Sequence, residues 1–284
     1  MESSKVWLVT GASKGLGLTL TKKLLERGYR VAATSRRKTA LIEAVGAESA
    51  HFLPLEVDLQ DEKSVKNAIA ITLEHFGAFN VVVNNAGYGQ IGTLEELSDG
   101  EARQSFDVNV FGLLHVVRHA MPHLRAQGSG HFFNIASVGG YDGGFPGWGI
   151  YCATKFAVAG LSEGLAEEVK RFGVQVTIVY PGYFRTNFLA GDSVKTPLRP
   201  IDAYQEARAS ERVHQRELNG NQPGDPEKAA EVLIRVSNEP APPLHLFLGE
   251  DAFGLAHRKM ETVRVQLEQW KALTVSTGFS EQLA

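Results

Sequence analysis

Short apolar runs rich in β-branched residues alternate with longer segments of helical period along almost the whole chain. Several of the runs are apolar at consecutive positions, as strands buried on both faces of a parallel sheet are. The seven runs cover 6–10, 30–35, 50–57, 79–85, 130–137, 174–180 and 244–249. This alternation predicts an α/β fold, a doubly wound sheet of about seven parallel strands with helices on both faces. Such a sheet binds its ligand at the carboxyl ends of the strands.

Helical periodicity fills the intervals between these runs. A helix is expected directly after the first run, where Leu16, Leu20 and Leu24 repeat at helical spacing. Asp225 as N-cap and Pro226 at the first helical position predict the start of another. This helix is expected to cover about 226–238, and four more are expected at about 61–76, 98–127, 148–172 and 251–271.

The chain has the length and composition of an ordinary globular protein, with 284 residues of which 43% are hydrophobic and 21% charged. No repeat or interdomain linker divides it, so we expect a single domain over 1–284. The segment 183–224 is long and polar, with a short helix expected near 202–218. A connection of that length in a compact domain is usually functional, which predicts a substrate lid; a surface insertion without a role is the alternative.

Charge and apolar patterning exclude several function classes. Lys and Arg number 29 against 32 Asp and Glu, so no basic excess is available for nucleic acid. No apolar stretch approaches the roughly 20 residues that span a bilayer, and the first residues show no secretory leader. Cys152 is the only cysteine and cannot form an intramolecular disulfide. We therefore expect a cytoplasmic protein without nucleic-acid or membrane partners.

The first run leads directly into the glycine-rich stretch TGASKGLG at 10–17. Gly11, Gly15 and Gly17 form a turn that opens a helix, where absent side chains let a pyrophosphate approach backbone N–H groups. The pattern alone is also compatible with an ordinary turn, because turns before helices often need glycine. Its place between a strand and a helix at the start of the fold favours phosphate binding.

The end of the second run indicates which dinucleotide binds. NAD sites usually carry an acidic residue here, for the adenosine ribose hydroxyls. This chain has Ser35, Arg36 and Arg37 instead, and Arg36 with Lys14 can pair with a 2′-phosphate. The sequence thus favours NADP(H) over NAD(H), although two arginines before a helix are often simply solvated.

In the stretch YCATK, Tyr151 and Lys155 stand four residues apart within an expected helix, so their side chains share one face. Such a pair alone is usually a solvated helix edge. Here it is accompanied, in order, by TGASKGLG, NNAG at 84–87, VNVFG at 108–112, NIAS at 134–137 and PGYFRT at 181–186. Together these motifs closely resemble the short-chain dehydrogenase/reductase family, whose fold is a single Rossmann-like domain with a seven-stranded parallel sheet.

The resemblance assigns four catalytic roles. It makes Tyr151 the acid and base, and Lys155 the residue that lowers the pKa of the phenol and binds the nicotinamide ribose. A nearby positive charge favours the phenolate, which would make a tyrosine usable near neutral pH. Ser137 matches the serine that hydrogen-bonds the substrate carbonyl, and Asn109 the asparagine that anchors a water in a proton relay.

The resemblance also implies the cofactor contacts. The phosphate loop would be Gly11, Ser13, Lys14, Gly15, Leu16 and Gly17, and Ser35 and Arg36 would select the adenosine ribose. Asp58 and Leu59 would contact the adenine, and Asn85, Ala86 and Gly87 would form the strand end beside the ribose. Pro181, Gly182 and Thr186 would hold the carboxamide of the nicotinamide. Phe184 departs from the family pattern, in which a smaller aliphatic residue is more common.

Two further features invite other chemistry. Cys152 has no histidine in the matching motifs to activate it, so we expect a small buried side chain rather than a nucleophile. His115, His119 and His123 repeat every four residues, but such a stripe drifts off one helix face and Pro122 disturbs the last turn. We expect no metal site.

Aromatic residues gather in the loop 138–149 and at the start of the 183–224 segment. Such side chains suit an apolar pocket, although they could equally pack the lid or a partner subunit. They are Tyr141, Phe145, Trp148, Tyr183, Phe184 and Phe188. We expect a medium-sized, mainly apolar ketone, aldehyde or alcohol as substrate.

The sequence as a whole predicts an NADP(H)-dependent oxidoreductase that transfers a hydride between nicotinamide and a carbonyl or alcohol substrate. A non-catalytic dinucleotide sensor and an epimerase or lyase on a related scaffold are the alternatives. The helices expected at 98–127 and 148–172 match the family's dimerisation surfaces, which implies a homodimer or homotetramer.

Overall fold

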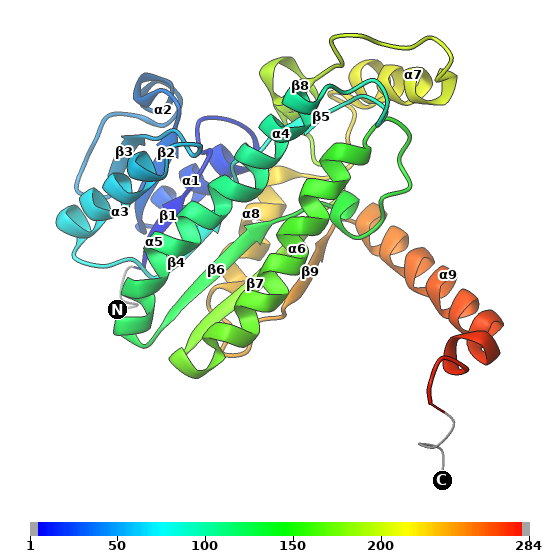
Figure 1. Cartoon of the computed structure of the whole chain (residues 1–284). Coiled ribbons are helices and arrows are strands. Elements are labelled where there is room, and N and C mark those ends of the chain that lie inside the picture. The colour runs from blue at the N-terminus through cyan, green and yellow to red at the C-terminus, as the bar shows by residue number, and fades with distance from the viewer. Residues whose placement is uncertain (1–4, 280–284) are drawn as a thin grey trace.

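The computed structural model describes residues 5–279. Its central sheet has seven strands in the order β3-β2-β1-β4-β6-β7-β9, and every neighbouring pair is parallel. The strands are β1 (Val6–Val9), β2 (Arg30–Ser35), β3 (Phe52–Glu56), β4 (Val81–Asn84), β6 (Gly130–Ile135), β7 (Val174–Pro181) and β9 (His245–Leu248). All seven coincide with the apolar runs, and the prediction of a doubly wound parallel sheet is confirmed (Figure 1).

The helices follow the predicted periodicity with two differences. They are α1 (Gly15–Glu26), α2 (Lys38–Val45), α3 (Glu62–Phe76), α4 (Asp99–Phe106), α5 (Gly112–Gln127), α6 (Gly149–Val169), α7 (Gln205–Arg212), α8 (Pro226–Val236) and α9 (Glu250–Val275). No apolar periodicity predicted α2, because this short helix buries only Leu41. The helix expected over 98–127 is divided by a π-helical turn at Asp107–Phe111.

Side chains of successive strand residues point to opposite faces of the sheet, which explains the continuous apolar runs. In β1, Val6 and Leu8 pack into the layer formed by α3, α5 and α6. Trp7 and Val9 pack into the layer formed by α1 and α8. A strand covered on both faces cannot alternate apolar and polar residues, so the apolar runs are a direct consequence of the two helical layers.

The sheet changes direction of winding between β1 and β4, which are neighbours although β2 and β3 lie between them in the chain. The loops that follow these two strands therefore lie side by side, where such sheets bind ligands. The Asn85 side chain donates to the carbonyls of Thr10 and Gly11 at 2.9 and 3.0 Å. Gly11 has a φ of +66°, and a Cβ there would lie 2.7 Å from the Cα of Ala86. Only glycine allows these loops to approach so closely.

The segment after β7 returns over the carboxyl ends of the strands. Its short strand β8 (Val194–Lys195) pairs in parallel with β5 (Gly89–Gln90), which follows β4. The helix expected at 202–218 is α7 together with a π-helical turn, Val213–Leu218. Figure 1 shows β5, β8 and α7 together at the same end of the molecule. This position is compatible with a lid, which stays a prediction.

The helix α9 leaves the body of the molecule (Figure 1). Of its 26 residues only Ala252 and Ala256 are buried.

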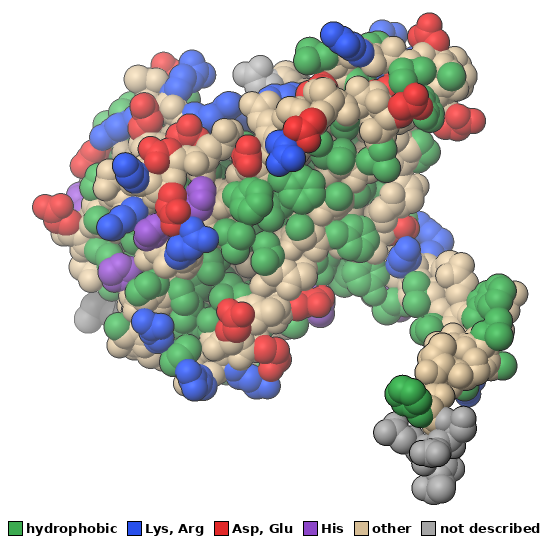
Figure 2. All heavy atoms as spheres, in the orientation of Figure 1, with side chains coloured by type: hydrophobic (Ala, Val, Ile, Leu, Met, Phe, Trp, Pro, Cys, Tyr) green, Lys and Arg blue, Asp and Glu red, His purple; other side chains and the backbone are tan. Residues whose placement is uncertain are grey.

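An exposed apolar surface lies on the face that carries α5 and α6, where Figure 2 shows hydrophobic side chains surrounded by charged ones. Within residues 5–279, no helix is long and apolar enough to cross a membrane.

The buried side chain of His131 makes folding sensitive to acid. Its Nε2 lies 2.9 Å from the Thr177 hydroxyl oxygen. The Thr177 hydroxyl donates its own proton to the carbonyl of Pro243, so the ring nitrogen must be the donor. Burial lowers the pKa of His131 from 6.5 to about 3. The unfolded chain takes up this proton near pH 6.5 and the folded chain only near pH 3, so stability falls as the pH falls through this window.

We therefore expect wild-type protein to lose about 3 kcal/mol more unfolding free energy than His131→Gln between about pH 7 and about pH 4. Glutamine keeps a hydrogen-bond donor but has no charged form. Urea unfolding of both proteins at the two pH values measures this difference. An equal loss in both proteins would show that His131 does not control the acid response.

Candidate active site

One cavity of about 480 Å³ extends from the glycine turn at 11–17 to the segment after β7. It lies at the carboxyl ends of the strands, where the change of winding places it. All but three of the predicted site residues line it, including Ser137, Tyr151 and Lys155 together with the glycine turn. The three exceptions are Gly17, Asn109 and Tyr141.

Gly17 lies behind the cavity wall rather than in it. A Cβ on this residue would come within 2.4 Å of the Asn85 side-chain nitrogen and 2.7 Å of the Gly11 carbonyl oxygen. The missing side chain thus lets α1 pack against the loops after β1 and β4. Gly17 shapes the turn, and its neighbours Gly11 and Gly15 line the cavity itself.

Tyr141 does not take the place in the substrate pocket that the sequence predicted. A short 3-10 turn at Val138–Gly140 redirects the chain after β6. The Tyr141 ring then packs edge-on against Tyr180 and Phe247, with centroids 5.8 and 5.1 Å apart. The other predicted aromatic residues do line the cavity: Phe145, Trp148, Tyr183, Phe184 and Phe188.

Ser137 and Tyr151 meet because β6 ends where α6 begins. Ser137 follows β6, and its hydroxyl oxygen accepts a hydrogen bond from the backbone N–H of Gly139 at 3.1 Å. Tyr151 lies in the first turn of α6, and the Ser137 side chain is near enough to its phenol to lower the pKa of that group. Tyr151 is buried, with 8% of its surface exposed. A hydroxyl pair in an enclosed cavity can hold one carbonyl oxygen between two hydrogen bonds.

Lys155 lies one turn further along α6, on the same face as Tyr151. Its Nζ donates to the carbonyl of Ile135 at 2.8 Å and lies 5.9 Å from the centre of the Tyr151 ring. Burial lowers the pKa of Lys155 from 10.5 to about 8. Removal from water disfavours the charged form of an amine, and the single carbonyl does not compensate for it.

The pKa of Tyr151 shifts in the direction opposite to the one that the sequence predicted. Burial raises it above its usual value, because the phenolate loses its solvation. The interaction with the Ser137 side chain opposes this rise in pKa but does not cancel it. Desolvation is therefore the larger effect here, and the phenol stays protonated near neutral pH.

Asn109 supports the site through hydrogen bonds to two neighbouring elements. It lies in the π-helical turn, and its carboxamide accepts from the N–H of Tyr88 and donates to the carbonyl of Tyr88, both at 3.0 Å. The same amide nitrogen donates to the Thr154 hydroxyl at 3.1 Å. A Cβ on Gly87 would lie 3.0 Å from the Asn109 oxygen and 3.5 Å from the Lys155 Nζ. Asn109 thus ties the loop after β4 to α6, and the water relay stays a prediction.

The other end of the cavity fits a dinucleotide. The helix α1 begins after Lys14 without a side-chain cap, so its first N–H groups remain available to an anion. Gly15, the first residue of the helix, has a φ of +60°. The positive helix end, the absent glycine side chains and the Lys14 side chain together suit a pyrophosphate.

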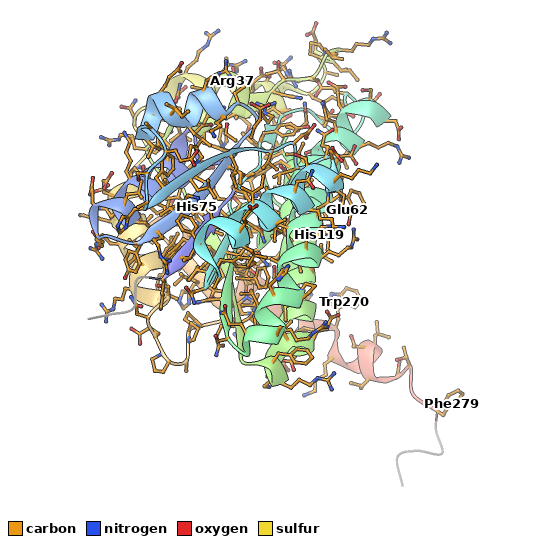
Figure 3. The ribbon with its side chains drawn as sticks, turned by 90° about the vertical axis from the view of Figure 1, so that its left-hand side faces the viewer. Arg37, Glu62, His75, His119, Trp270 and Phe279 are labelled. Atoms are coloured by element: carbon orange, nitrogen blue, oxygen red, sulfur yellow. The ribbon has the colours of Figure 1, made fainter. Side chains whose placement is uncertain are left out.

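The end of β2 carries polar and basic groups beside this anion site. The hydroxyls of Ser35 and Ser13 lie 3.1 Å apart. Arg36 and Arg37 both line the cavity, and Arg37 precedes α2 at the edge of the molecule (Figure 3). Asp58 lines the cavity from the loop after β3.

Several lining residues had no signal in the sequence. Lys195 lines the cavity from β8, and its Nζ donates to the side chain of Gln104 at 3.0 Å. The Tyr183 hydroxyl lies 3.0 Å from the Nε2 of His214. The other ring nitrogen of His214 lies 2.7 Å from the Ser210 carbonyl, so it carries the proton and Tyr183 donates to Nε2. These contacts join residues far apart in the chain, which no local pattern reveals.

An apolar wall faces Tyr151. The Trp148 ring meets the Tyr151 ring edge-on at 5.5 Å, and Phe188 lies 6.0 Å from it. Cys152 belongs to the same buried cluster, and burial raises the pKa of its thiol to about 11. A thiol with so high a pKa is a poor nucleophile, in agreement with the expectation from the sequence.

The histidines of α5 interact with groups other than a metal. His115 Nδ1 lies 2.8 Å from the Leu59 carbonyl, and His119 Nε2 lies 3.1 Å from the carboxylate of Glu62. Figure 3 shows Glu62 and His119 close together on neighbouring helices. His123 meets the ring of Phe79 edge-on. Among residues 5–279, no group of three or more His, Cys, Asp or Glu side chains could hold a metal ion.

Comparisons with known proteins agree with this geometry. A family model described as short chain dehydrogenase matches residues 5–195. Oxidoreductase BOA17 of Botryotinia fuckeliana is 34% identical over 278 residues, which cover 97% of this chain and all of the relative. A short-chain dehydrogenase of Streptomyces avermitilis has a TM-score of 0.89 and 36% identity, covering 98% of this chain and all of that one.

Two further solved structures similar to this chain contain cofactors. A short-chain dehydrogenase/reductase of Burkholderia phymatum, in complex with NAD, has a TM-score of 0.81 and 25% identity over 93% of this chain and 95% of that one. ElxO with NADP bound has a TM-score of 0.73 and 25% identity over 89% of this chain and all of that one.

The buried ammonium of Lys155 should make the protein more stable in alkali. Below about pH 8 the folded chain carries the full desolvation penalty of the charge. Between about pH 8 and pH 10.5 the folded chain releases the proton before the unfolded chain does, so the penalty is relieved. Relative to Lys155→Met, wild-type protein should gain about 2 kcal/mol between about pH 7 and about pH 9.5. Urea unfolding at both pH values tests this, and a constant difference would contradict it.

Proposed function

This chain belongs to the short-chain dehydrogenase family, and we propose that it is an NADP(H)-dependent oxidoreductase that interconverts a carbonyl compound and its alcohol. The observation that carries the proposal is the convergence of Ser137, Tyr151 and Lys155 in the same cavity as the uncapped start of α1. A dinucleotide held by its phosphates at α1 would extend toward these three side chains.

The nicotinamide cofactor supplies or accepts the hydride when it is bound. The chain itself orients the substrate and moves the proton. Ser137 and Tyr151 hold the carbonyl oxygen between their hydroxyls, and during reduction the Tyr151 hydroxyl donates its proton to that oxygen. The raised pKa of Tyr151 keeps this donor protonated. During oxidation the phenolate form of Tyr151 accepts the proton of the substrate hydroxyl, and the nearby Lys155 ammonium stabilises that phenolate.

The preference for NADP(H) rests on the end of β2. Arg36 and Arg37 line the cavity there, and Lys14 contributes a third basic side chain from the glycine turn. A guanidinium binds a phosphate through paired, charge-assisted hydrogen bonds. The related structures contain NAD in one case and NADP in another, so the preference is carried by these residues rather than by the family.

The apolar wall supports a mainly apolar substrate of medium size. Phe145, Trp148, Phe188 and Leu189 form this wall beside Tyr151. An apolar pocket with a few polar groups at one end binds a hydrophobic body and orients a single polar group. The polar group would be the carbonyl held by Ser137 and Tyr151.

A homodimer through α5 and α6 is the assembly that we propose. Phe111 and Phe156 are exposed by 49% and 43% on this part of the surface, and Leu161 lies on α6 as well. Large exposed apolar patches commonly mark interfaces between proteins. The exposed hydrophobic side chains in Figure 2 lie over α5 and α6.

Replacement of Tyr151 by phenylalanine should reduce turnover by roughly a thousandfold or more, because the proton donor is lost while the ring remains. The dissociation constant of NADPH should stay within about threefold of the wild-type value. Oxidation of NADPH with a panel of carbonyl compounds measures the first quantity, and fluorescence titration the second. Undiminished turnover would reject the assignment, and a wild-type protein that binds NADPH without consuming it would favour a sensor or a lyase.

Replacement of Arg36 by alanine should raise the KM for NADPH by about tenfold or more and leave the KM for NADH nearly unchanged. The guanidinium would contact only the 2′-phosphate, which NADH lacks. Lys38→Ala is a matched control, since this nearby cation pairs with Glu48 and does not line the cavity. Equal increases for both cofactors in Arg36→Ala would argue against a role in selecting the phosphate.

A further inference from the structure

The outer part of α9 has little contact with the body of the molecule, apart from Lys259, whose Nζ lies 4.0 Å from the carboxylate of Asp142. Beyond Ala256, every residue as far as Phe279 is exposed except Lys259, which is half-buried. Figure 3 shows Trp270 on this helix, away from the sheet and its helical layers. In proteins most of the stability of a helix comes from the packing of its apolar face.

The exposed part of α9 carries a regular apolar stripe. The stripe starts at Phe253 and Ala256 and continues through Met260, Val263, Leu267 and Trp270, so the intervals alternate between three and four residues. Side chains at these intervals form a narrow seam along one side of a helix, as in coiled coils. The last four keep between 41% and 59% of their surface exposed.

We propose that this stripe packs against the same stripe of a second copy of the chain, with the two α9 helices antiparallel. In this arrangement Met260 lies opposite Trp270 of the second copy, and Val263 lies opposite Leu267 of the second copy. Symmetry repeats both contacts, so four apolar layers cover the exposed seam. The first layer pairs a thioether with an aromatic ring, which is a favourable contact.

The charges beside the seam fit this antiparallel arrangement. On one flank, Arg264 lies near Arg264 of the second copy, and the carboxylates of Glu261 and Glu268 lie beside this pair of cations. Glu268 of each copy lies toward Arg264 of the other, and Glu261 of each copy lies toward Lys271 of the other. Within one helix the same residues already form ion pairs, Arg264 with Glu261 at 2.7 Å and Lys271 with Glu268 at 3.9 Å. Each helix therefore carries a row of alternating acidic and basic side chains, and the pairing of two helices places the two rows side by side. On the other flank, Gln266 lies near Gln266 of the second copy, and both side chains are uncharged.

A parallel arrangement in register is less favourable. In a parallel pair, a residue that flanks the seam on one helix lies near the residue five positions later in the sequence on the other helix. This rule brings Lys259 of each copy near Arg264 of the other, so the interface contains two repulsive contacts between cations. The antiparallel arrangement has one contact between cations, Arg264 with its own counterpart, and carboxylates lie beside it. The charge pattern therefore favours the antiparallel pairing of α9 over the parallel one. This contact is separate from the apolar face on α5 and α6, so it would add a second interface to each subunit.

Sedimentation velocity over a range of protein concentrations tests the seam. Replacement of Leu267 by glutamate should raise the dissociation constant of this association by roughly a hundredfold or more, because it buries two carboxylates in apolar layers. The matched control is Val265→Glu, which changes an exposed apolar residue on the opposite side of the same helix, 47% exposed against 59% for Leu267. The control should leave association and turnover unchanged. Equal effects of the two variants would overturn the proposal.

The orientation has two tests of its own. Glu261→Lys should weaken association about tenfold, and addition of Lys271→Glu should restore it, because the charges are then exchanged across the interface. The double variant Met260→Cys with Trp270→Cys should form a disulfide-linked dimer on mild oxidation. These positions are about 15 Å apart within one helix, too far for a bridge inside one chain.

Self-association that does not respond to Leu267→Glu would reject the second copy as the partner. Failure of the charge exchange to restore association, or the absence of a covalent dimer, would reject the antiparallel orientation. Flotation with vesicles of neutral or anionic phospholipid gives the remaining comparison. Wild-type binding to the vesicles that Leu267→Glu abolishes, without any change in self-association, would assign the stripe to a membrane surface instead.

Discussion

The close approach of the loops after β1 and β4 is the constraint on which the site depends. These strands are neighbours in a parallel sheet, so their carboxyl ends deliver two loops to one place. Gly11 and Gly17 leave no room for a side chain against Ala86 and Asn85. The resulting crevice exposes the start of α1, which needs an anion or water to satisfy its N–H groups. A larger residue at either glycine would separate the loops and displace α1 with its anion site.

Burial governs the chemistry at the other end of the cavity. It raises the pKa of Tyr151 and lowers that of Lys155 to about 8, so both groups favour their neutral forms more than in water. The charged amine is retained at a cost in stability, as groups at functional sites often are. The side chain of Asn109 is bonded to Tyr88 and Thr154, and it keeps the loop after β4 in contact with α6. Rigid support of this kind limits the movement of the reacting groups.

Local patterns in the sequence predicted most of the fold and much of the site. The seven strands were recognisable because burial on both faces requires continuous apolar residues, and the spacing of Tyr151 and Lys155 placed them on one helix face. The patterns failed where a side chain's direction depends on a turn or a distant partner. Tyr141 faces β7 because the turn before it redirects the chain. Lys195 and His214 reach the cavity through a segment whose sequence has no clear period.

The alternation of strands and helices, the glycine turn and the order of the motifs follow from the sequence alone, because each depends on neighbouring residues or on a fixed helical interval. The depth of burial around Tyr151, and with it the direction of the shift in its pKa, comes from the packed fold, because desolvation is produced by all of the surrounding elements together. The packed fold also decided that the stripe on α9 lies beyond the body. Periodicity shows that one face of a helix is apolar, whereas the path of the chain shows what remains to cover it.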